Sequence, residues 1–235
     1  MKKYIGTKQI EAEPMTMGEA YEKGLLQAGR VPNESEKGNA GYHVKYKDGY
    51  ESWSPAGSFE NTYKVADTAL DRILIEGVEL NDRLGKLKNF ILTEKFEELD
   101  SDSKAMLFAQ VGIMQEYRHI INLRYAKMEG GMVNCSNLYF GTAITLLSAG
   151  FAIRRKGWNG KGLFVVKQVP AHITEEIIPK MQSLPQSAKN LILKGKGFID
   201  YTSQCLIYNE NTGRADSWVP SISDMFAEDW EIVID

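Results

Sequence analysis

The apolar periodicity of residues 66–128 constrains the fold more than any other feature of this chain. A first apolar stripe recurs at helical spacing through Leu80, Leu84, Leu87 and Ile91. The segment "ELDSDSK" interrupts it, with Asp100 or Ser101 as the expected N-cap of the next helix. A second stripe then continues to about Met128 through Leu107, Val111, Met114, Tyr117 and Ile121. These patterns predict two long amphipathic helices that form an αα-hairpin.

A hairpin of this kind has more apolar surface than one helix pair covers. It must pack on the N-terminal unit, on another copy of itself, or on both. A two-fold contact between copies is the simpler solution, because it turns one hairpin into a four-helix arrangement. We therefore predict a homo-oligomer that forms through residues 66–128.

Residues 1–60 have the pattern of a small unit of helix and strands. Thr16 and Glu19 have capping-box spacing, which predicts a short helix to about Gly29. The segment "GYHVKYKDGYESWSP" alternates apolar and polar residues on both sides of Asp48-Gly49. This pattern predicts strands at about 42–47 and 50–54, joined by a two-residue turn. Trp53 and Tyr46 are expected to be core residues or cross-strand partners.

After Gly130-Gly131 the long helical periodicity gives way to short helix and strand patterns. This pair is therefore the predicted domain boundary, with domains at 1–130 and 134–235. The segment "FGTAITLLSAG" predicts a short helix that Gly150 closes, and "FAIRRKG" and "GLFVVKQV" predict strands. Residues 172–196, which contain Pro179 and Pro185, predict an insertion of two short helices. A strand pair in "FIDYTSQCLIYNENTG" and a final strand in "EIVI" are also expected.

The predicted fold class is therefore α+β. A small N-terminal α/β unit with a long αα-hairpin precedes a compact α+β domain with a helical insertion.

Composition excludes several classes of function. The net charge of −3 argues against a general binder of DNA or RNA polymers, and no apolar run approaches the length of a membrane span. The N-terminus lacks the apolar segment of a signal peptide, and Cys135 and Cys205 have the pattern of reduced thiols, so a cytosolic protein is expected. His43, His119 and His172 are far apart in sequence, and the chain has no phosphate loop or nucleophile elbow. We expect no enzyme activity, no metal and no cofactor.

The segment "RRKGWNGKG", residues 154–162, is the best candidate for a binding site. A nucleotide needs an aromatic plane for its base, and its phosphates need cations and backbone N–H groups that glycine leaves accessible. This segment supplies all of these, and "SWVPSISD", residues 217–224, adds a second Trp, hydroxyls and a carboxylate. The alternative is that Trp158 and Trp218 are core residues and that the glycines only turn the chain. The residues themselves leave both interpretations open.

Longer segments resemble known phage families. Residues 138–234, with "AGFAIRRKGWNGKGLFVVK" and "DSWVPSISDMFAEDWEIV", closely resemble the second Thoeris anti-defence family, and residues 172–196 resemble the helical insertion of its longer members. Residues 64–128, with "LNDRLGKLKNFILTEKFEEL" and "MQEYRHIINLRY", resemble the helical hairpin shared by the first Thoeris anti-defence family and the second anti-CBASS family. The leading unit is similar to the N-terminal domain of the first Thoeris family.

The resemblance implies a fused double sponge that works in the cytoplasm of the infected bacterial host. Such proteins bind immune second messengers without cleaving them: cyclic ADP-ribose isomers in Thoeris, and cyclic dinucleotides or trinucleotides in CBASS. Their pockets form between subunits, in hexamers for the hairpin type and in tetramers for the second type. The alternative function is a phage structural or assembly protein that uses the same modules for subunit contacts.

The resemblance also guides the choice of ligand-binding residues. In the C-terminal domain the predicted residues are Arg155, Trp158, Asn159, Trp218, Ser221 and Asp224. Trp230 of "AEDW" is expected to be a structural anchor instead. In the hairpin, Phe90, Arg118 and Arg124 are candidates for base stacking and phosphate contact, although their spacing equally suits a core Phe and solvated arginines.

Overall fold

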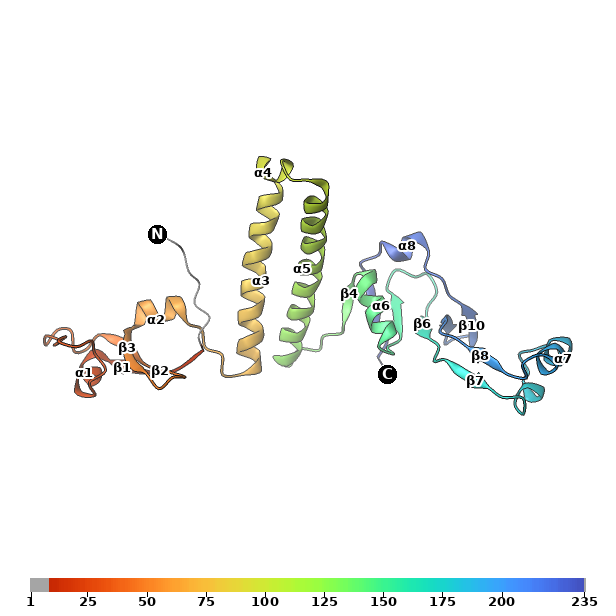
Figure 1. The fold of residues 1–235 in the computed structure, drawn as a ribbon, viewed down its shortest axis with the longest axis horizontal. Coiled ribbons are helices and arrows are strands. Elements are labelled where there is room, and N and C mark those ends of the chain that lie inside the picture. The colour runs from red at the N-terminus through yellow and green to blue at the C-terminus, as the bar shows by residue number, and fades with distance from the viewer. Residues whose placement is uncertain (1–8, 235) are drawn as a thin grey trace. The chain divides into compact units, whose positions relative to one another are not determined.

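A computed structural model describes residues 9–234 of the chain. It divides into two compact units, one that ends at Ile75 and one that begins at Glu76, and each is described by itself. Residues 1–8, with which the predicted leading unit and the N-terminal segment compared with a signal peptide both begin, lie outside the described residues. The predicted fold class, α+β, is confirmed (Figure 1).

The first unit is built on an antiparallel sheet in the order β1-β2-β3. The predicted capping box is confirmed, because Thr16 Oγ1 accepts the Glu19 N–H and the Glu19 carboxylate accepts the Thr16 N–H. The helix ends earlier than predicted, because Gly24 adopts a left-handed φ of +71° soon after it. The elements are β1 (Ile10–Thr16), α1 (Met17–Glu22), β2 (Ala40–Tyr46), β3 (Glu51–Pro55) and α2 (Ala56–Thr62).

The predicted β-hairpin is confirmed, but its turn differs from the expected one. The Gly49 N–H donates to Tyr46 O at 3.0 Å, and the Tyr46 N–H donates to Tyr50 O at 2.8 Å. Residues 47–49 therefore form a three-residue turn, with Gly49 at a φ of +84°. The Trp53 indole donates to Met15 O at 2.9 Å, which places this side chain between strands, as expected.

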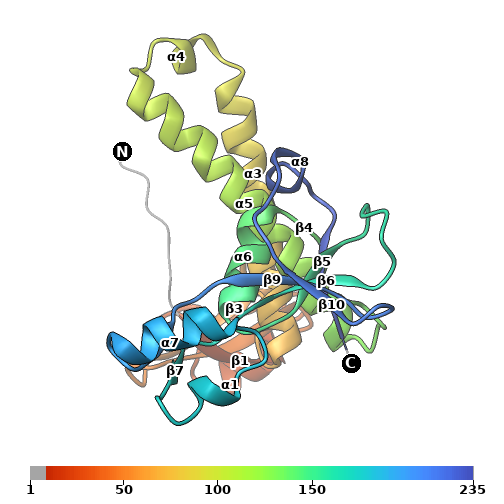
Figure 2. The same cartoon turned by 90° about the vertical axis from the view of Figure 1, so that its right-hand side faces the viewer.

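The predicted αα-hairpin is confirmed in α3 (Ala69–Ile91) and α5 (Ser101–Met128), with the short α4 (Glu94–Glu97) at its tip (Figure 2). Asp100 is the N-cap of α5 and accepts the Ser103 N–H at 2.9 Å. The helices approach closely, because a Cβ on Gly77 would lie 3.2 Å from Ile121 Cγ2. Leu84 is only 1% exposed, so the chain itself already covers the middle of the first stripe.

The C-terminal half is an antiparallel sheet in the order β10-β9-β6-β5-β11-β4, with α6 packed against it. Leu138, Ile153, Val165 and Trp230 are fully buried at this interface. Gly150, at a φ of +98°, follows α6 as predicted. The elements are β4 (Ser136–Leu138), α6 (Phe140–Ser148), β5 (Ile153–Arg155), β6 (Leu163–Lys167), β9 (Cys205–Asn209), β10 (Arg214–Ser217), α8 (Ile222–Met225) and β11 (Trp230–Ile232).

The insertion is carried by a strand pair of which only the second strand was predicted. The strand β7 (Ala171–Ile173) pairs with β8 (Ile199–Tyr201), and η1 (Ile178–Lys180) and α7 (Gln186–Lys194) lie between them. The predicted strand pair within "FIDYTSQCLIYNENTG" is wrong, because β8 pairs with β7, whereas β9 pairs with β6 and β10. The segment between β8 and β9 returns the chain to the larger sheet, where the Gln168 N–H donates to Gln204 O at 2.7 Å.

Helix α5 also contacts the C-terminal half of the chain. The Tyr139 N–H donates to Glu116 Oε1 at 3.1 Å, and His119 Nε2 donates to Ser136 O at 2.7 Å. Ile120 and Leu123 pack against the core beneath the sheet. These contacts cross Gly130-Gly131, where the domain boundary remains a prediction.

Candidate functional site

Asp224 is the centre of the candidate site in the C-terminal half. It lies in the first turn of α8, where Ser221 is the N-cap and the two side chains form a capping box. Asp224 Oδ2 accepts the Ser221 N–H at 3.0 Å and the Ser221 hydroxyl at 2.8 Å. Only 7% of this residue is exposed, so its carboxylate depends on protein partners rather than on water.

The other carboxylate oxygen of Asp224 binds side chains from the "RRKGWNGKG" segment. Its Oδ1 accepts Arg155 NH1 and Trp158 Nε1, each at 3.0 Å. Arg155 also donates through Nε to Asp229 Oδ1 at 2.8 Å and through NH1 to Ser223 O at 3.2 Å. The sheet explains this arrangement, because β5 pairs with β11 and brings Arg155 opposite Trp230.

Electrostatics fix the charges of this cluster. Burial acts to raise the pKa of Asp224, but hydrogen bonds from Trp158, Ser221 and Arg155 outweigh it and lower the pKa to about 2. The pKa of Asp229 is also lowered, because hydrogen bonds from Arg155 and the Gly157 N–H outweigh the opposing effect of burial. The pKa of Arg155 is raised, mainly by its hydrogen bond with Asp229. At neutral pH the guanidinium therefore has two carboxylate partners inside the protein.

Three tryptophans meet beside these ion pairs. Trp230 is fully buried, and its indole donates to Asp224 O at 3.0 Å, which confirms the predicted structural anchor. Trp158 lies edge-to-face with Trp230 at a centroid distance of 5.5 Å, and Trp218 does so at 6.1 Å. Trp158 and Trp218 are both half-buried, so each combines contact with the core and an accessible surface.

The glycines of "RRKGWNGKG" are required by packing as well as by the turn. The Gly157 N–H donates to Asp229 Oδ2 at 2.7 Å, and a Cβ on Gly157 would lie 2.6 Å from that oxygen. A Cβ on Gly160 would lie 2.3 Å from Leu163 Cδ1. The Gly157 amide is thus occupied by Asp229, whereas Asn159 is exposed on the loop.

The structure brings together most of the predicted residues of this half. Arg155, Trp158, Ser221 and Asp224 are hydrogen-bonded to one another, and Trp218 joins them through Trp230. Asp229 was not among the predicted residues. The missing information was the pairing of β5 with β11, which joins segments far apart in sequence.

The predicted residues of the hairpin lie apart. Phe90 packs edge-to-face with the buried Phe96 near the tip, at a centroid distance of 6.2 Å. Arg118 donates to Asn81 Oδ1 at 3.1 Å, and Asn81 lies about 13 Å along α3 from Phe90 at the helical rise per residue. Arg124 is exposed on α5. The structure therefore does not unite Phe90 with Arg118 within one chain.

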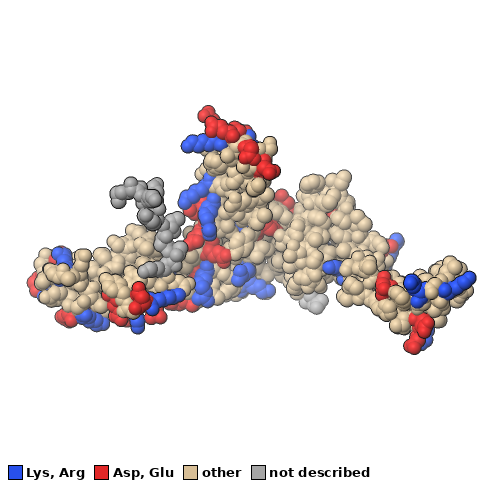
Figure 3. Space-filling model, in the orientation of Figure 1, with Lys and Arg blue, Asp and Glu red and all other residues tan. Residues whose placement is uncertain are grey.

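Acidic side chains cluster at the tip of the α3–α5 hairpin, around α4 (Figure 3).

Comparison with known proteins finds family matches for two regions of the chain. Residues 138–233 match the Thoeris anti-defense 2-like domain, and residues 67–127 match Sequestin. In chain order, a region that matches Sequestin, the Sequestin domain, precedes a region that matches the Thoeris anti-defense 2-like domain. It is also similar to Thoeris anti-defense 2 of Bacillus phage SP01, with 27% identity over 103 residues that cover 42% of this chain and 97% of that protein. The predicted fusion of two sponge modules is confirmed, and both families indicate a phage anti-defence protein that binds signalling molecules.

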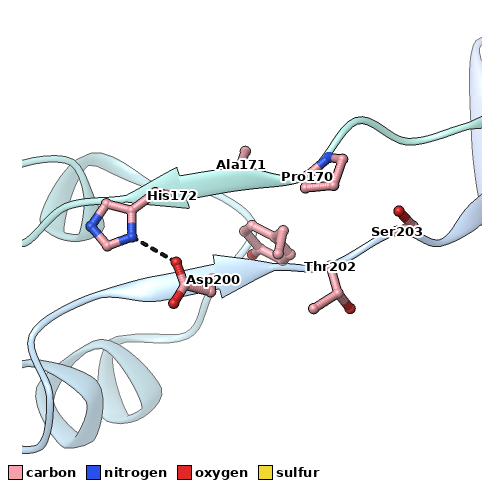
Figure 4. Close-up of a pocket in the computed structure, with 7 residues that line it drawn as sticks. Pro170, Ala171, His172, Asp200, Thr202 and Ser203 are labelled. Atoms are coloured by element: carbon pink, nitrogen blue, oxygen red, sulfur yellow. Dashed lines mark hydrogen bonds and ion pairs between the residues drawn. The ribbon is translucent and has the colours of Figure 1, made fainter.

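The surface hollows of the Thoeris anti-defense 2-like domain include one beside β7 and β8 and one next to α8. The larger, about 470 Å³, lies beside β7 and β8, where His172 Nδ1 donates to Asp200 Oδ1 at 2.6 Å (Figure 4). None of the predicted ligand residues lines it. The smaller, about 250 Å³, lies next to α8 and is formed by residues 139–141 and 225–228.

Among residues 9–234, no group of three or more His, Cys, Asp or Glu side chains has an arrangement that would hold a metal ion. Nor does any helix there have the length and apolar character needed to cross a membrane.

Proposed function

We propose that this protein sequesters cyclic nucleotide second messengers of bacterial immunity without cleaving them. The Thoeris anti-defense 2-like domain would take cyclic ADP-ribose isomers, and the Sequestin domain would take cyclic dinucleotides or trinucleotides. The protein would act as a homo-oligomer in the cytoplasm of the infected bacterial host. The alternative of a phage structural or assembly protein is not favoured by the two family matches.

For the C-terminal half, the proposal depends on one observation: the Trp158 ring is held in a fixed orientation but is still partly accessible. Asp224 holds its indole N–H, and Trp230 supports its ring. A ring fixed in this way loses little freedom when a base stacks on it, and such stacking contributes about 1–3 kcal/mol per base.

The same geometry suggests that some of the other residues position Trp158 and that others contact the ligand. Arg155 and Asp224 are engaged with each other and with Asp229, so we propose that they position Trp158. Asn159 and Lys161 are exposed on the loop, and we propose that they contact the ligand directly. The charge of Lys161 suits a phosphate.

For the Sequestin domain, the apolar residues left exposed on the hairpin support self-association. Val78 is 63% exposed on α3, and Ile113 is 71% exposed on α5. Large exposed apolar side chains on long helices are typical of helix-bundle contacts between copies. We propose that such contacts bring Phe90 of one copy near the arginines of another.

Recovery of the ligand tests the proposal. The purified protein is incubated with cyclic ADP-ribose or with cyclic di-AMP, washed by gel filtration and then heat-denatured. A sponge retains the ligand and releases it unchanged, as mass spectrometry of the supernatant would show. Release of a linear product would identify an enzyme, and no retention would support the structural alternative.

A further inference from the structure

The glycine-rich loop between β5 and β6, residues 156–162, is anchored at both of its ends. Near its start, the Gly157 N–H donates to a carboxylate. At its end, the Asn211 side chain donates through Nδ2 to Lys161 O at 2.7 Å, and the Glu210 N–H donates to Gly162 O at 2.9 Å. The exposed stretch between these anchors is therefore restrained before a ligand binds, which lowers the entropy cost of binding.

The turn that supplies Asn211 is ordered by its own hydrogen bonds. It joins β9 to β10, and the Asn211 N–H donates to Asn209 Oδ1 at 3.0 Å. The Gly213 N–H donates to Asn209 O at 2.8 Å, with Gly213 at a φ of +71°. Because Leu163 of β6 pairs with Asn209, the turn lies beside the end of the loop. The strand register, rather than a local motif, therefore brings Asn211 to Lys161.

Gly162 leaves the space that this contact needs. Its φ of +74° favours glycine, and a Cβ there would lie 2.6 Å from Asn211 Nδ2 and 2.5 Å from Glu210 Cγ. The Glu210 carboxylate approaches the same Cβ position, to 2.8 Å, so it lies on the side of Gly162 that faces the turn. A larger residue at position 162 would push the turn away from the loop.

The hydrogen bond from Asn211 also fixes the direction of a backbone N–H group. The C=O and N–H groups of a trans peptide point in opposite directions, so the Gly162 N–H points away from Asn211. Among residues 9–234, no acceptor binds this N–H, and no carboxylate forms an ion pair with the exposed Lys161 side chain. A cation and a backbone N–H on neighbouring residues are a combination that binds phosphate.

We infer that Asn211 is a positioning residue of the nucleotide site. It holds the Lys161–Gly162 peptide so that the Gly162 N–H and the Lys161 ammonium bind one phosphate of a nucleotide whose base stacks on Trp158. The donors define the ligand group, because the segment 154–167 supplies cations and N–H groups and contains no acidic residue. The inference rests on the proposed nucleotide-binding function and names the residue that fixes its phosphate contact.

A double-mutant cycle on the full chain tests this role, with calorimetric titration of cyclic ADP-ribose. Lys161→Ala should weaken binding by about tenfold, as expected for a lost charge-assisted contact. Asn211→Ala should weaken it by about threefold or more, and Asn211→Asp, which replaces the donor by an acceptor, by at least as much. The Lys161→Ala/Asn211→Ala double variant should lose clearly less than the product of the two single losses, because both changes remove the same phosphate contact.

Two further measurements separate positioning from a purely structural role. Added NaCl should weaken the binding of the wild type more than that of Lys161→Ala or Asn211→Ala, because both variants lack the full phosphate contact. Asn190→Ala, which removes the exposed Gln186–Asn190 hydrogen bond of α7, is the matched control and should stay within about twofold of the wild type. Circular dichroism of each variant confirms that the fold is retained.

The outcomes distinguish the positioning role from the proposed function. If cyclic ADP-ribose does not bind the wild type, both the proposed function of this domain and the positioning role are overturned. If the wild type binds and Asn211→Ala binds equally well, the positioning role is wrong and the proposed function stands. The same holds if the double variant shows the full product of the two single losses.

Discussion

The indole N–H of Trp158 donates a 3.0 Å hydrogen bond to Oδ1 of Asp224, a residue 66 positions further along the chain. This bond connects the glycine-rich loop after β5 to the first turn of α8. The same carboxylate binds Arg155 and caps α8 through Ser221. The stability of the domain and the orientation of its most promising ligand-stacking residue therefore depend on a single acid.

Replacement of that acid should destabilise the domain. Asp224→Asn keeps the shape of the side chain but removes the charge that Arg155 and Trp158 share, so a buried cation loses one partner. Loss of one partner of a buried ion pair costs about 3–5 kcal/mol, and the remaining Asp229 should limit the cost to about 2–3 kcal/mol. Urea unfolding measures this change. Asp216→Asn, which affects the exposed Arg214–Asp216 pair, is the matched control and should cost less than about 1 kcal/mol.

The free energy of unfolding should depend on pH through the carboxylate of Asp224. The pKa of Asp224 is lowered from 3.8 to about 2 in the folded state, so its contribution is fully present above the unfolded pKa and is lost as pH falls toward 2. At 1.36 kcal/mol per pKa unit the contribution is about 2 kcal/mol. The urea midpoint of the wild type should fall between about pH 5 and pH 2, and that of Asp224→Asn should fall less steeply. Parallel curves for the two proteins would assign the acid sensitivity to other carboxylates.

A methyl group at position 157 should disturb the contact between the glycine-rich loop and Asp229. A Cβ there would lie 2.6 Å from Asp229 Oδ2, so Gly157→Ala must displace the carboxylate that holds Arg155. We expect a loss of about 1–3 kcal/mol in the free energy of unfolding and a change in Trp fluorescence. Gly85→Ala is the control, because a Cβ on this helical glycine meets nothing within 4 Å and should stabilise α3 by up to about 1 kcal/mol. Equal stability of both variants would show that the loop adapts freely.

The exposed face of the hairpin should control the oligomeric state. Leu84 is 1% exposed within the chain, so its replacement by Asp would unfold the hairpin rather than report on subunit contacts. Ile113→Asp instead places a charge on an exposed side chain, and it should lower the native mass without loss of helicity. Light scattering and circular dichroism measure the two effects. An unchanged native mass for both Ile113→Asp and Val78→Asp would place the subunit contacts elsewhere.

Local chemistry made several elements predictable from sequence. The Thr16–Glu19 capping box, the Asp100 N-cap and the close of α6 at Gly150 each depend on residues within a few positions, and all are confirmed. The helical stripe also predicted the hairpin, although the position of Leu84 shows that part of it serves the chain's own packing.

Long-range pairing explains what sequence patterns missed. The arm of β7 and β8 depends on segments separated by the whole insertion, and no local pattern specifies that contact. In the site, the residue types were suggested by the motifs, but the engagement of Arg155 by Asp229 follows from the pairing of β5 with β11. Arg155, predicted from its motif as a ligand-binding cation, therefore lies between the carboxylates of Asp224 and Asp229 of the same chain.

Trp158 provides the most direct test of the account. A sponge has no turnover, so it must bind a scarce messenger tightly, at about nanomolar Kd or roughly −12 kcal/mol. Stacking on Trp158 would contribute about 1–3 kcal/mol of that, so Trp158→Ala should weaken binding by about tenfold to a hundredfold. Trp230→Phe, which changes the buried anchor, should alter stability but not affinity.

The measurement is a calorimetric titration of the full chain with cyclic ADP-ribose, for the wild type, Trp158→Ala and Trp230→Phe. The account predicts a Kd at least about tenfold higher for Trp158→Ala than for the other two proteins. An unchanged Kd in a folded Trp158→Ala variant would contradict it, and would make "RRKGWNGKG" a surface turn whose tryptophan serves only the core.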